Sequence, residues 1–364
     1  MSTSTPSCLP GAGNLDQATE LLWNAVSAAD EYVATELVLR MLDDGGAPES
    51  VLLDVIARVQ GRVGEEWAAN RISVAQEHAA TAINERAIAA VSVHSASRTT
   101  ATRGRITVAC ADGEWHALPA RLLTEVLKLR GWQVDYLGAQ VPTAHLIAHL
   151  HNTQADAVAL SSSIATRLPT VHAAITACQA IGVPVLVGGA AFGPEGGYAR
   201  LLGADAWAPD ARAAAECLAK EPLPRPQPDH QQFDDLPHLA DQEYTFVTRT
   251  SASLVRQVFT ALEDAFPAMR AYSDLQRERT AEDLAHIVEF LATALYLDDE
   301  ELFTWFITWT SQILVARGVP AMSLPPALDL LGRELGEFPR AARILRAGTH
   351  ALATAHFTAA GNTA

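Results

Sequence analysis

The sequence predicts a mixed fold in which an α/β domain lies between two all-helical parts. Apolar residues recur at helical spacing over residues 15–101, short β-branched runs alternate with helical stretches over 104–220, and a helical pattern returns over 244–360. Residues 221–243 include four prolines within seven residues, which predicts an extended linker. A chain of 364 residues has room for two or three such domains.

The first part predicts a bundle of four antiparallel helices. A Gly-Gly pair at 45–46 interrupts the helical pattern, and Pro48 suits the first turn of a third helix. The apolar stripe of that helix continues to Trp67. Ser73 and Gln76 have the spacing of a capping box that opens a fourth helix. Four helices joined by short links favour a small antiparallel bundle.

The second part predicts a parallel sheet with helices on both faces. Between its β-branched runs lie helical stretches at 118–129, 143–152 and 168–181, the arrangement of repeated βαβ units. This pattern is typical of a flavodoxin-like doubly wound fold, which binds ligands at the carboxyl ends of its strands. The five predicted strands cover residues 105–110, 133–137, 157–161, 183–189 and 204–208.

The third part contains one helix, predicted over 299–317, in which aromatic residues are concentrated. Trp305 and Trp309 are four residues apart and share a face, while Phe306 lies on an adjacent one. Because both faces are apolar, we expect this helix to be buried or to line a pocket.

Charge and composition exclude several classes of function. The net charge of −16 argues against direct binding to DNA or RNA and against attraction to an anionic membrane surface. The four cysteines are too far apart for a zinc knuckle or a disulfide framework. The chain has neither a transmembrane-length apolar run nor the features of a signal peptide, so we expect a cytoplasmic location.

The loop after the first predicted strand carries a pair of residues suited to metal ligation. Glu114 stands two residues before His116, where a carboxylate can fix the imidazole tautomer and raise the basicity of the other ring nitrogen. Taken alone, a histidine on a loop such as His116 is more often a solvated side chain than a metal ligand. The third and fourth strands run into polar or small residues, among them Ser161, Ser163, Gly188 and Gly189.

These residues resemble the cobalamin-binding domain of methionine synthase, corrinoid proteins and mutases. The resemblance implies that His116 replaces dimethylbenzimidazole as the lower cobalt ligand (the base-off/His-on state) and that Glu114 braces it. It also implies that the displaced nucleotide tail runs past the serines and the Gly-Gly pair. Pro119 stands where the family prefers Gly. The cobalamin-binding residues expected on this basis are His116, Glu114, Trp115, Ser161, Ser163, Gly188, Gly189, Tyr136 and Gly138.

Trp67 is followed after nine residues by Glu77 and His78, a spacing that resembles light-sensing cobalamin regulators of carotenoid synthesis. The resemblance implies that the helical bundle caps the upper face of the corrin, with Trp67 against the adenosyl group and Glu77-His78 binding it. The alternative is that Trp67 belongs to the bundle core and Glu77 to a solvated face. Those regulators also have an N-terminal helix-turn-helix domain, where this sequence begins with the bundle. They carry a cobalt-capturing His after the Trp, where Ala68 stands here.

The last helical part looks like a globin-type sensor domain, and the three parts together resemble the photocobilins. That resemblance implies a biliverdin-type bilin beside adenosylcobalamin. The bilin would be noncovalent, because no cysteine follows Cys217. Haem with His286 as axial ligand and an empty interaction module remain alternatives. The residues expected around a bilin are His286, Asp283, Tyr272, Arg277, Trp305 and Trp309.

The sequence therefore predicts a cobalamin photoreceptor that is not itself an enzyme. Light would cleave the cobalt–carbon bond, and the domains or an oligomer would then rearrange. We expect a homo-oligomer, with a dimer favoured, and an unknown downstream signalling protein. The alternatives are a corrinoid methyl carrier of a methyltransferase system and a haem-based sensor with a cobalamin module.

Overall fold

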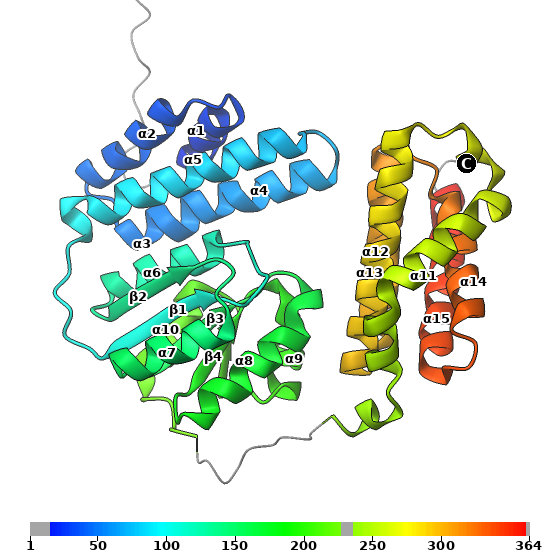
Figure 1. The fold of residues 1–364 in the computed structure, drawn as a ribbon. Coiled ribbons are helices and arrows are strands. Elements are labelled where there is room, and N and C mark those ends of the chain that lie inside the picture. The colour runs from blue at the N-terminus through cyan, green and yellow to red at the C-terminus, as the bar shows by residue number, and fades with distance from the viewer. Residues whose placement is uncertain (1–14, 227–235, 362–364) are drawn as a thin grey trace, which may run out of the picture. The chain divides into compact units, whose positions relative to one another are not determined.

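The computed structural model describes residues 15–226 and 236–361, which form two compact units, Met1–Gln231 and Gln232–Ala364 (Figure 1). The predicted N-terminal segment before residue 15 and the central part of the predicted 221–243 linker lie outside the described residues. Each unit has its own hydrophobic core and is described by itself.

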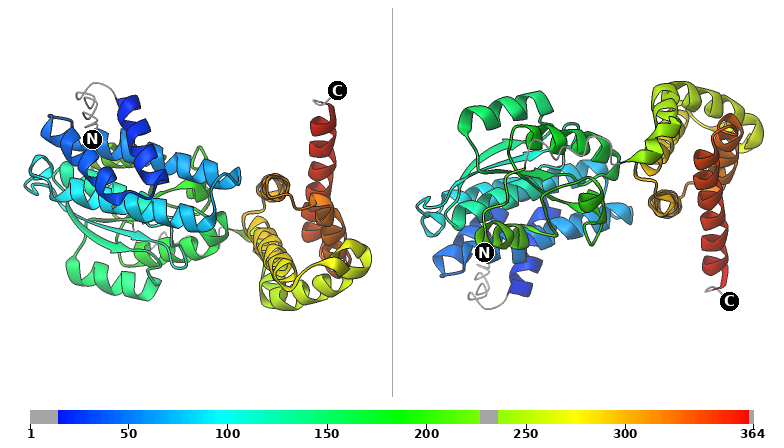
Figure 2. Two further views of the ribbon diagram at one scale, coloured as in Figure 1. Left: turned by 90° about the horizontal axis from the view of Figure 1, so that it is seen from above. Right: turned by 90° about the horizontal axis from the view of Figure 1, so that it is seen from below.

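Unit 1 begins with the predicted helical bundle, whose helices lie alongside one another over the α/β part (Figure 2). The predicted capping box is confirmed: the Ser73 hydroxyl accepts from the Gln76 amide, and the Gln76 side chain accepts from the Ser73 amide. The helices are α1 (Leu15–Ser27), α2 (Glu31–Asp43), α3 (Pro48–Ser50), α4 (Ala57–Ala68) and α5 (Val74–Val93). A short 3₁₀ turn, Ser95–Ser97, follows α5.

The third helix differs from the regular helix that the sequence predicts. Between α3 and α4 the chain forms a π-helical segment, Val51–Ile56. Within these six residues Val51, Leu52, Val55 and Ile56 are all fully buried. These four residues have the i, i+1, i+4 and i+5 spacing of a single helix face, so their pattern fits a regular helix as well as the π turn.

The α/β part is a five-stranded parallel sheet in the order β2-β1-β3-β4-β5, as expected of a doubly wound fold. The last two strands are shorter than predicted. The strands are β1 (Arg105–Cys110), β2 (Gln133–Gly138), β3 (Ala157–Ser161), β4 (Val185–Gly188) and β5 (Ala206–Ala208). The helices between them are α6 (Leu118–Leu129), α7 (Thr143–Thr153), α8 (Leu168–Ala180), α9 (Gly197–Leu201) and α10 (Ala211–Lys220).

The bundle packs on the sheet domain through α6. Leu118 and Leu122 of α6 belong to the bundle core. Ion pairs join the same two parts: Glu49 of α3 contacts Arg130 at 2.9 Å and Arg212 at 3.2 Å. The bundle and the sheet therefore form one unit. The interface between them, called the seam below, contains both apolar contacts and ion pairs.

Unit 2 is entirely helical within its described residues. A buried carboxylate caps its last helix: Glu243, 2% exposed, accepts from the amides of Arg340 and Ala341. Its helices are α11 (Glu243–Ala265), α12 (Asp274–Leu297), α13 (Glu300–Ala316), α14 (Leu324–Glu334) and α15 (Pro339–Gly361), with 3₁₀ turns at Pro237–Asp241, Pro267–Ala271 and Ala321–Ser323.

The bounds predicted for the aromatic helix are confirmed, and of the two expectations for its faces, burial holds for one face only. Asp299 is the N-cap of α13 and Arg317 its C-cap. Phe303 and Phe306 are buried, whereas Trp305 is 60% exposed. α13 packs against α12 and α15, and Trp305 points away from this core.

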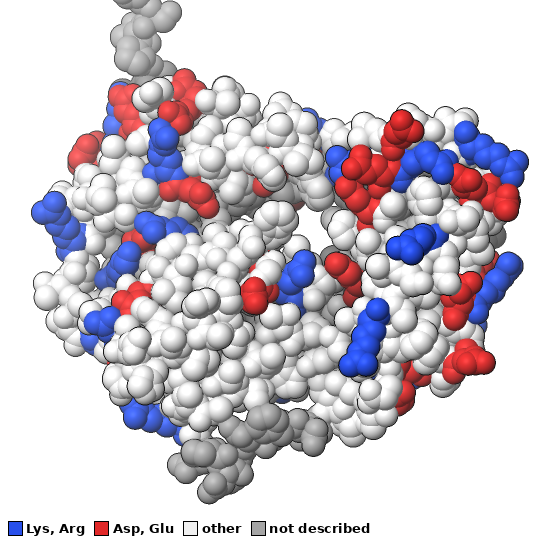
Figure 3. Space-filling model, in the orientation of Figure 1, with Lys and Arg blue, Asp and Glu red and all other residues white. Residues whose placement is uncertain are grey.

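The surface carries charges of both signs. On the face drawn in Figure 3, Lys and Arg stand among Asp and Glu in both units, and no continuous basic patch is visible there. Within the described residues no helix is long and apolar enough to cross a membrane.

Candidate functional site

The Glu114 carboxylate is the organising group of the predicted site. It is fully buried, on the loop between β1 and α6. Its Oε1 accepts from the His116 amide at 2.9 Å and contacts His116 Nδ1 at 2.6 Å. Its Oε2 accepts from the amides of Ser163 at 2.6 Å and Ile164 at 3.1 Å, and from the Ser162 hydroxyl at 3.3 Å. One carboxylate thus holds together the loops that follow β1 and β3.

These contacts determine the charge of the pair. Burial alone would raise the pKa of the Glu114 carboxyl, but the hydrogen bonds from His116 and Ser163 outweigh it and lower the pKa to about 2. The hydrogen bond to Glu114 is the largest cause of a raised pKa at His116. Because an ionised carboxylate accepts at Nδ1, the proton of a neutral His116 lies there, and Nε2 keeps the lone pair that a metal needs. The His116 side chain is 52% exposed, so Nε2 is accessible.

The strand register brings the other predicted residues to the same edge of the sheet. Cys110 at the end of β1 pairs with Ser161, Ser161 pairs with Gly188, and Ala109 pairs with Gly138. Because parallel strands end at one edge, the loop with Glu114 and His116 lies beside these strand ends.

Position 189 requires glycine for a structural reason that the sequence did not indicate. Its φ is +104°, and a Cβ there would lie 2.2 Å from the Ser162 carbonyl oxygen. The close approach is therefore by the chain's own backbone rather than by a ligand. Gly138 also has a left-handed φ, +82°, but a Cβ there would meet open space.

The predicted upper-face pair lies within electrostatic range of the lower one. Glu77 Oε2 contacts His78 Nδ1 at 2.5 Å, and Glu77 Oε1 accepts from the Thr81 hydroxyl at 2.9 Å. The charge of Glu77 is also one of the causes that raise the pKa of His116. The fold therefore brings α5 and the loop after β1 together across 39 residues of sequence.

Trp67 lies in the last turn of α4 and is partly buried, so it is neither a core residue nor fully solvated. Ala68 follows it as the last residue of α4 and has no side-chain atom that can ligate a metal. The structure places Trp67 and Glu77 on the two helices that meet at the α4–α5 turn (Figure 1).

Comparison with known proteins agrees with this geometry. Residues 104–218 match a family described as B12 binding domain, and residues 18–92 match a second family with the same description. Together the matches cover the bundle and the sheet, the two parts that the seam joins, and they support a corrinoid cofactor.

The relatives are corrinoid or regulatory proteins. The HTH-type transcriptional repressor CarA of Myxococcus xanthus is 31% identical over 182 residues, which are 48% of this chain and 58% of CarA. The monomethylamine corrinoid protein of Methanosarcina barkeri is 19% identical, with a TM-score of 0.49 over 56% of this chain and 98% of its own. A cobalamin-binding protein of Desulfitobacterium hafniense is 19% identical, with a TM-score of 0.32 over 57% of this chain and 98% of its own.

The residues of the segment 104–218 fit a corrinoid. Cobalt in a corrin needs a single protein ligand below the ring, and His116 presents one free nitrogen at the sheet edge. Trp115 beside it is 67% exposed, an apolar surface next to the proposed ligand. Within the described residues no group of three or more His, Cys, Asp or Glu side chains could hold a bare ion.

Two further residues have structural contacts at the site. The Tyr136 hydroxyl on β2 donates to the carbonyl of Ala117, the N-cap of α6, at 3.4 Å, so Tyr136 supports the end of the loop that carries His116. Ser162, which the sequence analysis did not single out, is buried and donates to Glu114. Its position between Ser161 and Ser163 was the available signal.

The six residues predicted around a bilin come from two helices and the turn before them: Arg277, Asp283 and His286 from α12, Trp305 and Trp309 from α13, and Tyr272 from the end of the 3₁₀ turn that precedes α12. Arg277 pairs with Glu263 and lies over the Phe259 ring, so it faces α11. Burial raises the pKa of Asp283, and the charges of His286 and of Arg317, the C-cap of α13, act in the opposite direction. His286 is exposed and Tyr272 is partly buried against the core. Trp305 and Trp309 stack at 6.1 Å with their planes 9° apart.

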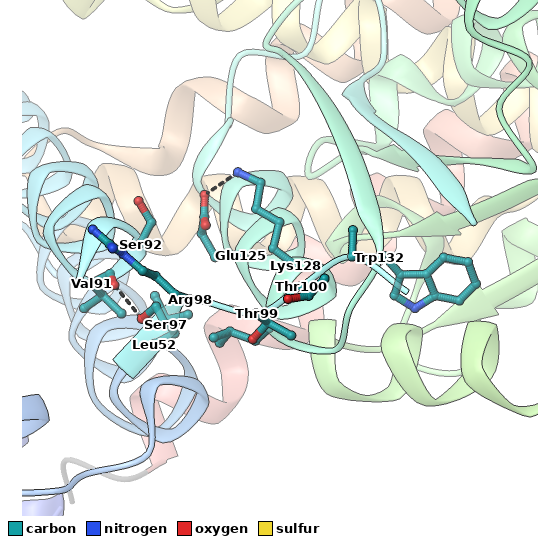
Figure 4. Close-up of a pocket in the computed structure, with 12 residues that line it drawn as sticks. Leu52, Val91, Ser92, Ser97, Arg98, Thr99, Thr100, Glu125, Lys128 and Trp132 are labelled. Atoms are coloured by element: carbon teal, nitrogen blue, oxygen red, sulfur yellow. Dashed lines mark hydrogen bonds and ion pairs between the residues drawn. The ribbon is translucent and has the colours of Figure 1, made fainter. Parts of the chain in front are cut away.

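A pocket of about 420 Å³ lies at the other end of α6 (Figure 4). Val91 and Ser97 line it from the end of the bundle, and Lys128 and Trp132 from the end of α6 and the start of β2. Lys128 is neutralised there by Glu125 at 3.2 Å. This pocket belongs to the seam between bundle and sheet and is separate from the edge that carries His116.

Proposed function

We propose that this chain is a light-responsive cobalamin protein that binds adenosylcobalamin in the base-off/His-on state. The observation that carries the proposal is the Glu114–His116 pair: a fully buried carboxylate on Nδ1 with Nε2 left accessible at the carboxyl edge of the sheet. The similarity of unit 1 to B12-binding domains supports the corrinoid.

The upper face supports the adenosyl form. When bound, adenosylcobalamin supplies a cobalt–carbon bond that light cleaves. Trp67 provides an aromatic wall for a bulky upper ligand, and the Glu77 carboxylate can accept from ribose hydroxyls. Because Ala68 offers no ligand, the state after illumination is held without a second imidazole from that position.

We extend the proposal to unit 2, as a globin-like domain that holds a biliverdin-type bilin noncovalently. The stacked Trp305–Trp309 pair on α13, with Trp305 exposed, and the polar side chains of Asp283 and His286 on α12 support this, because aromatic surface and polar groups together suit a flat tetrapyrrole. The bilin would extend the absorbed range toward the red.

We propose a regulatory rather than an enzymatic role. CarA, the relative that the chain resembles, is a transcriptional repressor, and this chain spans 58% of its length. The signal would pass through a homo-oligomer, with a dimer favoured, or to a signalling partner.

An absorption spectrum of the full chain tests this function. The protein is reconstituted with adenosylcobalamin and biliverdin and measured in darkness and after green or red illumination. We expect the cobalamin bands to change with light. Bands that do not respond to light would sink the photoreceptor proposal, and a strong preference for methylcobalamin over adenosylcobalamin would favour a methyl carrier instead.

A further inference from the structure

A chain of polar side chains runs from Glu77 into the interior of the bundle. Asn84 Nδ2 donates to Gln60 Oε1 at 2.7 Å, and Gln60 Nε2 donates to Thr81 Oγ1 at 2.8 Å. Thr81 in turn donates to Glu77 Oε1 at 2.9 Å. Every hydrogen bond points the same way, toward the carboxylate, so each one polarises the next, and the last one fixes the orientation of Glu77 Oε1.

The inner end of this polar chain lies in a costly position. Asn84 is fully buried among the apolar residues of α4 and α5, and its Oδ1 has no hydrogen-bond partner. A buried, unsatisfied amide oxygen destabilises the fold, and an apolar residue of similar size would avoid that cost. Bundle stability alone therefore does not explain an amide at this position.

The polar chain also links the two halves of the upper face. Thr81 and Asn84 are on α5 with Glu77, at spacings of four and three residues, so the three share one helix face. Gln60 is on α4, seven residues or about two helical turns before Trp67, so these two side chains lie on the same face of α4. Gln60 bridges the helices and so fixes the register between Trp67 and Glu77.

We propose that Thr81, Gln60 and Asn84 are positioning residues for the upper ligand. They hold the Glu77 carboxylate in one orientation and at one distance from Trp67, and so set the preference for a bulky adenosyl group over a small alkyl group. This inference rests on the proposed function, because it assumes that Glu77 and Trp67 face that ligand.

The test compares two corrinoids that differ only in the upper ligand. Dissociation constants for adenosylcobalamin and methylcobalamin are measured in darkness with the full chain. For Thr81→Val, which keeps the shape and removes the hydroxyl, we expect the preference for adenosylcobalamin to fall about tenfold while methylcobalamin binding stays unchanged. Thr81→Ser should restore the preference. Gln60→Met is the second variant, should Thr81→Val not fold.

Thr35→Val is the matched control. Thr35 is a partly buried helical threonine whose hydroxyl donates to the Glu31 carbonyl of its own helix at 2.7 Å. It should leave both constants unchanged. If Thr81→Val weakens both corrinoids equally or neither of them, the positioning role is refuted. If the wild-type chain binds both corrinoids equally, the proposed upper-ligand site fails and this inference fails with it.

Discussion

Unit 1 contains two carboxylate–imidazole pairs that are held in different ways. Glu114 is fully buried, and two backbone amides from the loop after β3 and one from its own loop fix it. Glu77 is 25% exposed on its side chain and is held by the side chains of His78 and Thr81. Backbone donors at a sheet edge do not change rotamer, whereas helix side chains can. The lower pair is thus suited to a ligand that stays and the upper pair to a ligand that leaves.

The largest effect should come from removing the lower imidazole. His116→Ala leaves no side-chain nitrogen at the sheet edge, so we expect the base-off/His-on spectrum to be lost completely. His78→Ala, which removes the imidazole of the upper pair, should keep that spectrum. Absorption titration with adenosylcobalamin in darkness measures both. A His-on spectrum that persists in His116→Ala would contradict the ligand assignment.

Replacing the two carboxylates should have clearly different effects on the stability of the protein. In Glu114→Gln the side-chain NH₂ would face backbone N–H donors such as those of His116 and Ser163. Because two donors cannot pair, we expect the free energy of unfolding to fall by about 3 kcal/mol. Cobalt affinity should fall about 10-fold to 100-fold as well, because the imidazole loses the partner that orients it. The matched change Glu77→Gln should cost about 1 kcal/mol or less. Urea unfolding followed by circular dichroism makes the comparison, and equal losses would remove the distinction drawn between the pairs.

Much of this arrangement follows from local sequence patterns. The strands were predicted because β-branched runs have a period that helices lack, and the Ser73–Gln76 capping box because its spacing is fixed by geometry. The Glu114–His116 pair was predictable because its members are two residues apart. The resulting contact at 2.6 Å is a local consequence of the loop.

Other features have no local signal. The amides of Ser163 and Ile164 that hold Glu114 are backbone groups, identical in every residue type except proline. The π-helical segment follows the helical hydrophobic pattern closely enough to be missed. Gln60 and Asn84 are 24 residues apart, and a polar residue in a helix is normally solvated. Tertiary packing alone brings such groups together.

Removing the upper aromatic wall should have an intermediate effect. We expect Trp67→Ala to weaken dark binding of adenosylcobalamin about tenfold through lost aromatic contact, with methylcobalamin unaffected. Trp23→Ala serves as control, because Trp23 is a bundle tryptophan that packs under Arg62. Equal binding of adenosylcobalamin by wild type and Trp67→Ala would show that the upper face is elsewhere.

The smallest effect concerns the seam that holds the two pairs in one unit. Hydrogen bonding from Arg130 is the main cause that lowers the pKa of Glu49 below its ordinary value of 4.5, with Arg212 assisting. A lowered folded-state pKa means that this stabilisation is present above about pH 4.5 and is lost as the pH falls through the folded-state value. Glu49→Gln should therefore lower stability by about 1 kcal/mol or less at pH 7 and by less at pH 3, where protonation removes part or all of the charge interaction. Thermal unfolding at both pH values checks this. A variant that is equally destabilised at pH 3 would mean that Glu49 acts through packing rather than through its charge, and the bundle would then be held on the sheet chiefly by apolar contacts such as those of Leu118 and Leu122.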